Sequence, residues 1–533
     1  MKKHLFWLAA LVLSVAACTN DPAAEEGNAP AGPTDNGKSG LTTVKLATFA
    51  GDNSRVTYAA ETRAEGDDAL QLGELRLVAS VANPSKSDDT FEKEESEDGR
   101  WMSATSVYYD ATADTYYATY HMQGNNYNTQ LNNDIAGAIQ TFKVGADGTV
   151  ELLDGFRAAN PSKEDYDFNH IYFDNVDNRI IVVGHNWKVP STYTGDEPYT
   201  GKRDNTRAII GVFNPADGSL SYKGINTDEK EYVEGTTTSL GYKDAGDANC
   251  VVRAYDYKSY YVATRKGLAV LHAEADQLFN AQLKADGTNY FVKTPGSAKF
   301  VCNKGTESNF DLLYLAEETG KDLEYTTQSA AKVAHFHVIT ESYGTFGALA
   351  DPADYNTELD PEAIAEYPNQ TDMPAVISPV DGKNVLFALD NSDVEEYAAL
   401  STGGLYCRYS DMGQTYEKLL TFDNRPVNGV FAEENRDNES YTKEDGTRGG
   451  HNGFIYVANG SKLTIFTRDT HKEVVSWNMP SKDAEGNEVE SSANYIVVTK
   501  GEKGSNGLCE RTITVAYGQE GLRIFKFMPV LTY

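Results

Sequence analysis

Cysteine is scarce in this sequence, and no two cysteines stand close enough together to form a C-x-x-C pair. Only 5 occur among 533 residues, so neither a zinc ribbon nor a thioredoxin-type redox site is available. Positive charge is also scarce, because 47 Lys and Arg residues stand against 79 Asp and Glu residues, a formal net charge of −32. Such a surface repels nucleic acid and does not attract anionic lipid. We therefore expect no nucleic-acid partner.

The sequence also lacks long apolar runs and amphipathic helical patterns beyond its N-terminus. No later run approaches the ~18 apolar residues that a membrane span needs. The missing helical patterns argue against α/β barrels and nucleotide-binding folds. The segment Gly32–Ser39 matches G-x-x-x-x-G-K-S, but a phosphate loop needs a strand before it and a helix after it. Here a Pro-rich coil precedes the match and a β-like segment follows, so we expect no cofactor.

Residues 1–17 have the order of a lipoprotein signal peptide. A basic start (MKK) is followed by the apolar run Leu5–Leu13 and the small residues Val15–Ala17, which is typical of an export signal. Cys18 comes next, and this arrangement resembles a bacterial lipobox, in which the cysteine is lipidated and becomes the first residue. An ordinary signal peptide with an incidental cysteine is the alternative. The lipid would be the only membrane anchor.

Residues 18–42 are predicted to form a flexible acidic tether. They are rich in Pro, Gly, Ala and acidic residues and show no apolar periodicity. Acidic residues soon after Cys18 resemble the surface-export signal of Bacteroidetes lipoproteins. The resemblance implies a lipid-anchored protein of the bacterial outer membrane, displayed at the cell surface. The alternative is that these acids only keep the tether soluble.

Beyond residue 70 the chain alternates β-branched or aromatic runs with Gly, Asp and Asn turns, which is typical of an all-β fold. A strand pattern of the form apolar-x-apolar-aromatic recurs in seven units. The seven markers are Ile139–Phe142, Ile210–Phe213, Leu268–Leu271, Val333–Phe336, Leu405–Arg408, Leu463–Phe466 and Leu522–Phe525. In the clearest units two strands precede the marker and a fourth strand follows an Asp-Gly turn, a strong hairpin signal.

Four antiparallel strands repeated seven times predict a seven-bladed β-propeller over residues 43–533, with its core blades at about 70–533. The last unit has only three strands before Tyr533, while an unassigned strand, Leu75–Ala79, precedes the first unit. Pairing that strand with the last unit would close the ring and protect two open sheet edges. A tandem pair of β-sandwiches is the alternative, but it does not account for seven markers.

Two resemblances accompany this pattern. Tyr456–Ile465, Val515–Ile524 and Tyr261–Leu268 resemble the Y-V-A-x-G-x-x-G-L-x-I unit of bacterial LVIVD-repeat propellers. That resemblance implies an exported propeller without an assigned catalytic role. Ser410–Tyr416 is similar to the Asp-box hairpin of sialidases, where it is a structural turn. The arginine cluster that holds the substrate carboxylate in sialidases has no matching motif here.

No catalytic or metal-binding residue is assigned. The sequence contains no G-x-S-x-G, H-E-x-x-H or dinucleotide fingerprint. His335 and His337 share a strand face and could form a metal pair, but without a third ligand nearby a solvent-facing pair is favoured. The acidic loop Asp174–Asn178 could hold calcium or be a solvated turn. The insert Glu433–Asn452 is expected to be solvated because it is rich in glutamate.

Two long connections follow the second strands of the first two units and are rich in Asn, His and aromatic residues. Loops of this length are uncommon unless they are functional or disordered, and function gathers on loops presented by a rigid scaffold. The candidate ligand-binding residues are His121, Asn125, Tyr127, His185, Trp187 and Tyr193. A mobile insertion without a ligand is the alternative.

The function expected from these features is a non-catalytic, ligand- or partner-binding lipoprotein. Besides the membrane reached through the lipid, its partner would be a glycan, a siderophore-like small molecule or another outer-membrane protein. The alternative is a glycan-active hydrolase or lyase with a propeller fold, which rests on analogy of fold alone. Four cysteines remain after Cys18, and they allow three disulfide pairings among which the sequence does not choose. They are Cys250, Cys302, Cys407 and Cys509.

Overall fold

The chain is all-β in the part that the structure describes. The computed structural model describes residues 40–48, 57–58, 73–84, 101–123, 137–157, 165–187, 207–232, 235–254, 257–284, 286–293, 298–306, 309–319, 332–342, 373–380, 384–390, 403–409, 416–422, 427–433, 439–442, 448–451, 453–467, 472–481, 493–505 and 507–529. Within these ranges every regular element is a strand, and no helix is long and apolar enough to cross a membrane.

Seven antiparallel sheets of three to five strands follow one another along the described chain. The first contains β5 (Trp101–Asp110), β6 (Thr115–Gln123), β7 (Ala138–Val144) and β8 (Val150–Arg157), and the second contains β9 (Asp165–Asp174), β10 (Arg179–Trp187), β11 (Arg207–Asn214) and β12 (Ser219–Gly224). The third contains β15 (Ala248–Arg253), β16 (Ser259–Thr264), β17 (Gly267–His272) and β18 (Phe291–Lys293), and the fourth contains β19 (Ala298–Thr306), β20 (Asn309–Thr319) and β21 (Lys332–Ser342).

The remaining sheets complete the series. The fifth contains β22 (Met373–Val380), β23 (Asn384–Asp390), β24 (Gly403–Tyr409) and β25 (Tyr416–Phe422), and the sixth contains β26 (Val427–Ala432), β29 (Phe454–Asn459), β30 (Lys462–Thr467) and β31 (Glu473–Asn478). The seventh contains β32 (Tyr495–Lys503), β33 (Cys509–Ala516), β34 (Leu522–Pro529) and β4 (Gly73–Val81). Separate hairpins are formed by β13 (Asn226–Tyr232) with β14 (Ser239–Asp244) and by β27 (Glu439–Thr442) with β28 (Arg448–His451).

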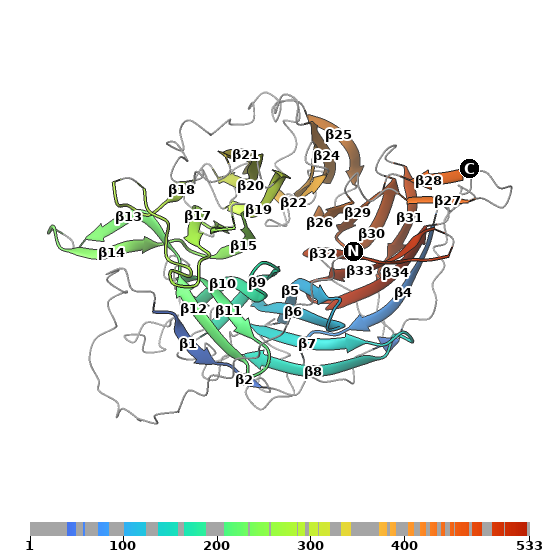
Figure 1. Cartoon of the computed structure of the whole chain (residues 1–533), viewed down its shortest axis with the longest axis horizontal. Coiled ribbons are helices and arrows are strands. Elements are labelled where there is room, and N and C mark those ends of the chain that lie inside the picture. Colours follow the sequence, from blue (N-terminus) through green and yellow to red (C-terminus); the bar gives the residue numbers. More distant parts are fainter. Residues whose placement is uncertain are drawn as a thin grey trace, which may run out of the picture.

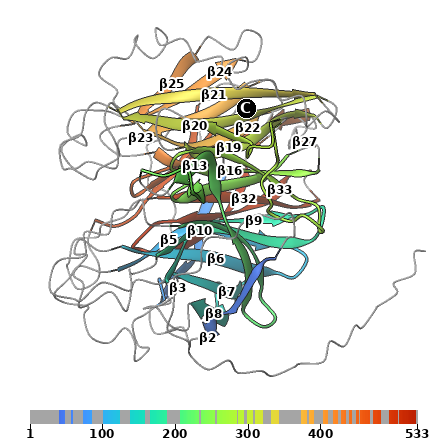
Figure 2. The same cartoon turned by 90° about the vertical axis from the view of Figure 1, so that its left-hand side faces the viewer.

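The first strand of each sheet, here called the inner strand, lies toward a common centre (Figure 1). The inner strands are β5, β9, β15, β19, β22, β26 and β32. Each of them contacts the inner strand of the next sheet, and β32 contacts β5. Figure 2 shows the same sheets from the side, with β8 near one end of the view and β21 near the other. The sheets thus succeed one another in chain order around the centre.

Every recurring apolar marker forms the third strand of its sheet, as the pattern predicts. Where the side chains are described, a third strand can be apolar on both faces because its sheet packs between two others. In β11, for example, Ile209 and Phe213 face the core that the second sheet shares with the first, whereas Ile210 faces the core shared with the third. A strand buried on both faces is continuously apolar rather than alternating.

The predicted Asp-Gly turns join third strands to fourth strands. Gly148 and Gly218 have φ angles of +85° and +70°, which L-residues with a side chain rarely adopt. Each turn also packs against a neighbouring sheet, which is the seventh sheet for Gly148 and the first sheet for Gly218. A Cβ on Gly148 would lie 2.3 Å from the carbonyl oxygen of Val78, and one on Gly218 would lie 2.5 Å from the ring of Phe156. Glycine is therefore required both by the turn and by the neighbouring sheet.

The seventh sheet contains strands from both ends of the chain. The strand predicted at Leu75–Ala79 lies within β4 and pairs antiparallel with β34, where Leu77 stands opposite Phe525. In Figure 1 this pair is the blue strand beside the red ones. The pairing is the one expected from the missing fourth strand of the last unit.

Before Leu75 the sequence indicates only a β-like segment after Ser39, and the structure has three short strands there. They are β1 (Thr42–Lys45), β2 (Ala47–Thr48) and β3 (Thr57–Tyr58). They add outer strands to the second, first and seventh sheets by pairing with β12, β8 and β4. Leu46, which is 2% exposed, enters the core between the first two sheets. Strands of two to four residues are too short to show a hydrophobic period in the sequence.

Candidate functional site

Two of the residues predicted to bind a ligand occupy equivalent positions in neighbouring sheets. His121 of β6 stands opposite Ser103 of β5, and His185 of β10 stands opposite Asp167 of β9. The sequence places both histidines at the start of long loops, but both lie inside strands because β6 and β10 continue beyond them. The edge at which inner strands begin and second strands end is here called the His185 edge.

Of the other predicted site residues, only Trp187 lies within the described residues. Trp187 is the last residue of β10. Cys18, Asn125, Tyr127 and Tyr193 lie outside the described residues, as do most of the Asp-box-like segment and the whole phosphate-loop-like segment. His335 and His337 lie on β21 and alternate with Phe336, so they share a face of that strand. Cys250 and Cys509 are buried free thiols.

His185 lies between two aspartates that come from different sheets. Its Nε2 is 3.3 Å from Oδ2 of Asp167, within the same sheet, and its Nδ1 is 3.7 Å from Oδ1 of Asp247, just before the third sheet begins. All three side chains are nearly inaccessible, with 6%, 4% and 9% of His185, Asp167 and Asp247 exposed. The imidazole thus lies between a carboxylate of the second sheet and one of the segment that leads into the third.

The same position carries an ionisable residue in five consecutive sheets. In the third sheet Arg265 takes the place of His185, since its backbone N–H donates to the carbonyl oxygen of Asp247 at 2.8 Å. In the fourth sheet the position is taken by Glu317, which directly follows Ala316, the partner of Ala298 at the start of β19. In the fifth sheet it is taken by Asp390, which stands opposite Met373 at the start of β22. Together with His121 and His185, the His185 edge thus carries basic residues over three sheets and acidic residues over the next two.

Asn186 was missed by reasoning from the sequence. It follows His185 in β10, is completely buried, and has no hydrogen-bond partner for either its amide oxygen or its amide nitrogen among the described residues. A buried polar group without a partner costs about 1–3 kcal/mol. Asn186 is therefore a further buried polar residue of the His185 edge.

The chemistry available at this edge is hydrogen bonding and proton exchange. An imidazole can donate or accept a hydrogen bond, and it is the side chain used most often as a general acid or base. The carboxylate oxygens accept hydrogen bonds from hydroxyl or amine donors. Across the described part of the chain, no cluster of three or more His, Cys, Asp or Glu residues is arranged to hold a metal ion.

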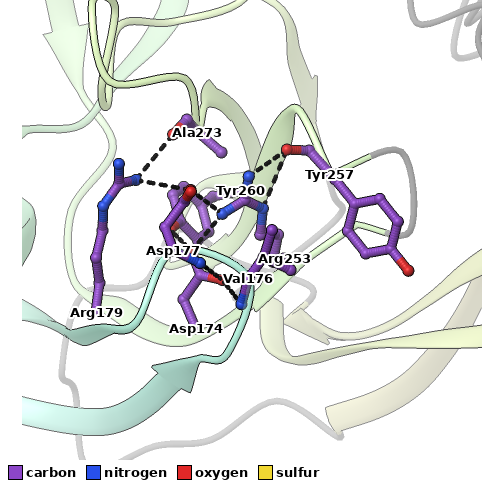
Figure 3. Close-up of polar contacts among 8 residues, drawn as sticks. All are labelled: Asp174, Val176, Asp177, Arg179, Arg253, Tyr257, Tyr260 and Ala273. Atoms are coloured by element: carbon purple, nitrogen blue, oxygen red, sulfur yellow. Dashed lines mark hydrogen bonds and ion pairs between the residues drawn. The ribbon is translucent and has the colours of Figure 1, made fainter. Parts of the chain in front are cut away.

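The acidic turn after β9 is occupied by a guanidinium (Figure 3). Arg253 of the third sheet donates to the carboxylates of both Asp174 and Asp177. The hydroxyl of Tyr260 also donates to Asp174, and burial followed by this hydrogen bond raises the pKa of Tyr260. The Nη1 atom of Arg179 lies 3.2 Å from Oδ2 of Asp177. The carboxylates that the sequence offers for calcium are thus used to bind the second sheet to the third.

A second buried ion cluster corrects the expectation that the insert after β26 is solvated. Glu433 and Glu439 are 5% and 4% exposed, and both pair with Arg511 of the seventh sheet, which is fully buried. The Nε and Nη2 atoms of Arg511 donate to the two oxygens of Glu433 at 2.9 and 3.0 Å, and its Nη1 donates to Glu439 at 3.0 Å. The Tyr456 hydroxyl donates to Glu433 at 2.6 Å. The glutamates therefore hold the sixth and seventh sheets together.

Comparison with known proteins assigns no family. No protein-family model matches the chain, and no curated protein matches it.

Proposed function

We propose that the chain is an outer-membrane lipoprotein, displayed at the cell surface, whose globular part is a seven-bladed β-propeller closed by an N-terminal strand. The lipobox-like N-terminus and the acids after Cys18 support the location. The LVIVD-like segments support the architecture, since each runs from a second strand into a third strand. The succession of inner-strand contacts and the β4–β34 pair support a ring of seven blades.

The proposed activity is non-catalytic capture of a ligand or partner at the His185 edge. The observation that carries it is the position of His185, held between Asp167 of its own sheet and Asp247 of the next. Residues from neighbouring sheets converge there, at the start of the long connection that the sequence predicts to be functional. Glycans, siderophore-like molecules and outer-membrane proteins are the proposed classes of ligand.

Binding is tested with the soluble protein beginning at Thr19. It is probed with an array of neutral oligosaccharides, a ferric catecholate and detergent-solubilised outer-membrane proteins. We expect one class to bind, and H185Q and D167N to weaken that binding at least tenfold, or about 1.4 kcal/mol, the scale of a hydrogen bond to a charged group. The control D286N alters an exposed turn carboxylate that accepts a hydrogen bond from the Thr288 backbone and should bind like the wild type.

Two outcomes would redirect the proposal. Equal affinity of H185Q and the wild type would move the binding surface away from this edge. Conversion of a bound oligosaccharide into products by the wild type but not by H185Q would establish the hydrolase or lyase alternative, for which the imidazole between two carboxylates is the supporting observation.

The anchor is tested separately. The variant C18A should leave the membrane fraction and appear in soluble form, because removal of the lipidation site removes the only proposed anchor. Fractionation followed by immunoblotting measures this, and mass spectrometry of the mature N-terminus detects the lipid. Retention of C18A in the membrane would reject the lipoprotein assignment.

A further inference from the structure

The inner strands of the first three sheets contain a β-bulge at the same place. The extra residues are Thr105, Asn169 and Asn249, each of which is skipped when the inner strand pairs with its neighbour. A bulge turns the side chain of the extra residue away from the regular alternation of the strand. In all three cases the side chain is thereby directed to the next sheet.

Each bulge residue donates a hydrogen bond to the main chain of that next sheet. The Thr105 hydroxyl donates to the carbonyl oxygen of Phe168 at 2.7 Å. The Asn169 amide donates to Ala248 at 3.0 Å, and the Asn249 amide donates to Ala298 at 2.7 Å. In each case the acceptor residue directly precedes the bulge in the inner strand of the next sheet. These hydrogen bonds therefore form a series from sheet to sheet.

The seventh sheet joins the same series. Asn494, immediately before β32, donates to the carbonyl oxygen of Ala104 at 2.8 Å. The series therefore runs from the seventh sheet through the first and second to the third and fourth.

One link of this series lies inside the candidate site. Asn169 is two residues after Asp167, and its acceptor Ala248 directly follows Asp247. The hydrogen bond thus ties together the two chain segments that bring the aspartates to His185. The contact between Asp167 and His185 lies within one sheet and is fixed by strand pairing. The contact with Asp247 crosses between sheets, so it depends on how the third sheet is held.

We infer that Asn169 is a positioning residue that sets the distance between His185 and Asp247. The inference rests on the proposed function of the His185 edge. Loss of the Asn169 amide should let the start of the third sheet move away, which uncovers the imidazole on its Nδ1 side. Loss of the Asn249 amide removes an equivalent bond one sheet further on and should leave His185 covered.

The test is the rate at which diethyl pyrocarbonate modifies His185, followed by mass spectrometry of its peptide. His272, at the opposite edge of the third sheet, serves as the internal reference. We expect N169A to accelerate modification of His185 at least threefold and N249A to leave it at the wild-type rate. N169T should restore the wild-type rate, because Thr105 makes the same link with a hydroxyl in the adjacent sheet.

Equal acceleration in N169A and N249A, or none in N169A, would overturn the inference. If N169A does not fold, N169T and N169V form a matched pair of equal volume that differs only in the hydroxyl. Faster modification in N169V than in N169T would then support the positioning role, and equal rates would reject it. The assay contains no ligand, so failure of the proposed binding function would be seen independently.

Discussion

A buried histidine joins two sheets that are not consecutive along the chain. The Nε2 of His170, in the inner strand of the second sheet, lies 3.4 Å from the hydroxyl of Tyr495, in the inner strand of the seventh. Their rings meet edge to face with centroids 5.3 Å apart. His170 is thus held inside the molecule between the second and seventh sheets.

His170 should make the protein sensitive to acid. Burial lowers the pKa of His170 from 6.5 to about 4. Between these values the unfolded chain binds a proton that the folded protein does not, so stability falls as the pH falls from 6.5 toward 4. The expected loss by pH 5 is about 2 kcal/mol. Urea unfolding at pH 7 and pH 5 measures it, and H170Q should lose less stability than the wild type by that amount. Equal losses in both proteins would contradict this assignment.

At the level of single elements, the Asp-Gly turns combine a local and a tertiary requirement. Gly148 and Gly287 both follow an aspartate and have similar φ angles of +85° and +79°. A Cβ on Gly287 would meet nothing within 4 Å, whereas one on Gly148 would collide with Val78. Alanine substitutions at these two glycines therefore distinguish the destabilisation caused by backbone strain from the destabilisation caused by a clash with a neighbouring sheet.

G287A should lower the free energy of unfolding by about 1–2 kcal/mol, the penalty for placing a side chain in the left-handed region. G148A should lower the free energy of unfolding by that amount and by about 1–3 kcal/mol more, because the added methyl group forces the first and seventh sheets apart. Free energies of unfolding from urea titrations would give both values. If G148A were no worse than G287A, the turn would not pack against the seventh sheet in solution.

At the scale of the whole molecule, the N-terminal strands contribute unequally. The strand β4 supplies a full partner for β34 and places Leu75 and Leu77 in the core shared by the sixth and seventh sheets. The strands β1, β2 and β3 are short, and Leu46, between β1 and β2, is buried in the core of the first two sheets. Closure of the seventh sheet should thus depend on β4 far more than on the strands before it.

Two truncated chains test this difference. A chain that begins at residue 61 lacks β1–β3 and should fold with a lower melting temperature, because burying a leucine contributes about 2–3 kcal/mol. A chain that begins at residue 85 also lacks β4 and should fail to unfold cooperatively, because both β34 and the adjoining core are exposed. Near-ultraviolet circular dichroism and thermal melts distinguish these states. Similar cooperative melts for both chains would show that β4 is dispensable.

Features of the fold that are local and periodic could be predicted from the sequence. The recurring apolar-x-apolar-aromatic runs marked the third strands, and in β11 the two faces of such a run enter two different cores. The Asp-Gly turns were marked because few residue pairs fit that backbone. The strand at Leu75–Ala79 and its partner could be inferred because an incomplete last unit leaves one pairing position open.

Contacts between polar side chains of different sheets could not be predicted from the sequence, because they depend on how the sheets are packed. Asp167 and His185 are paired by strand register, but Asp247 reaches them from the next sheet across about 60 further residues. Glu433 looked like part of a solvated insert until Arg511 was brought against it. The spacing of apolar residues along a strand indicates which face of the strand is buried. The partner of a buried charge depends instead on the order and spacing of the sheets. That information is absent from any short stretch of the chain.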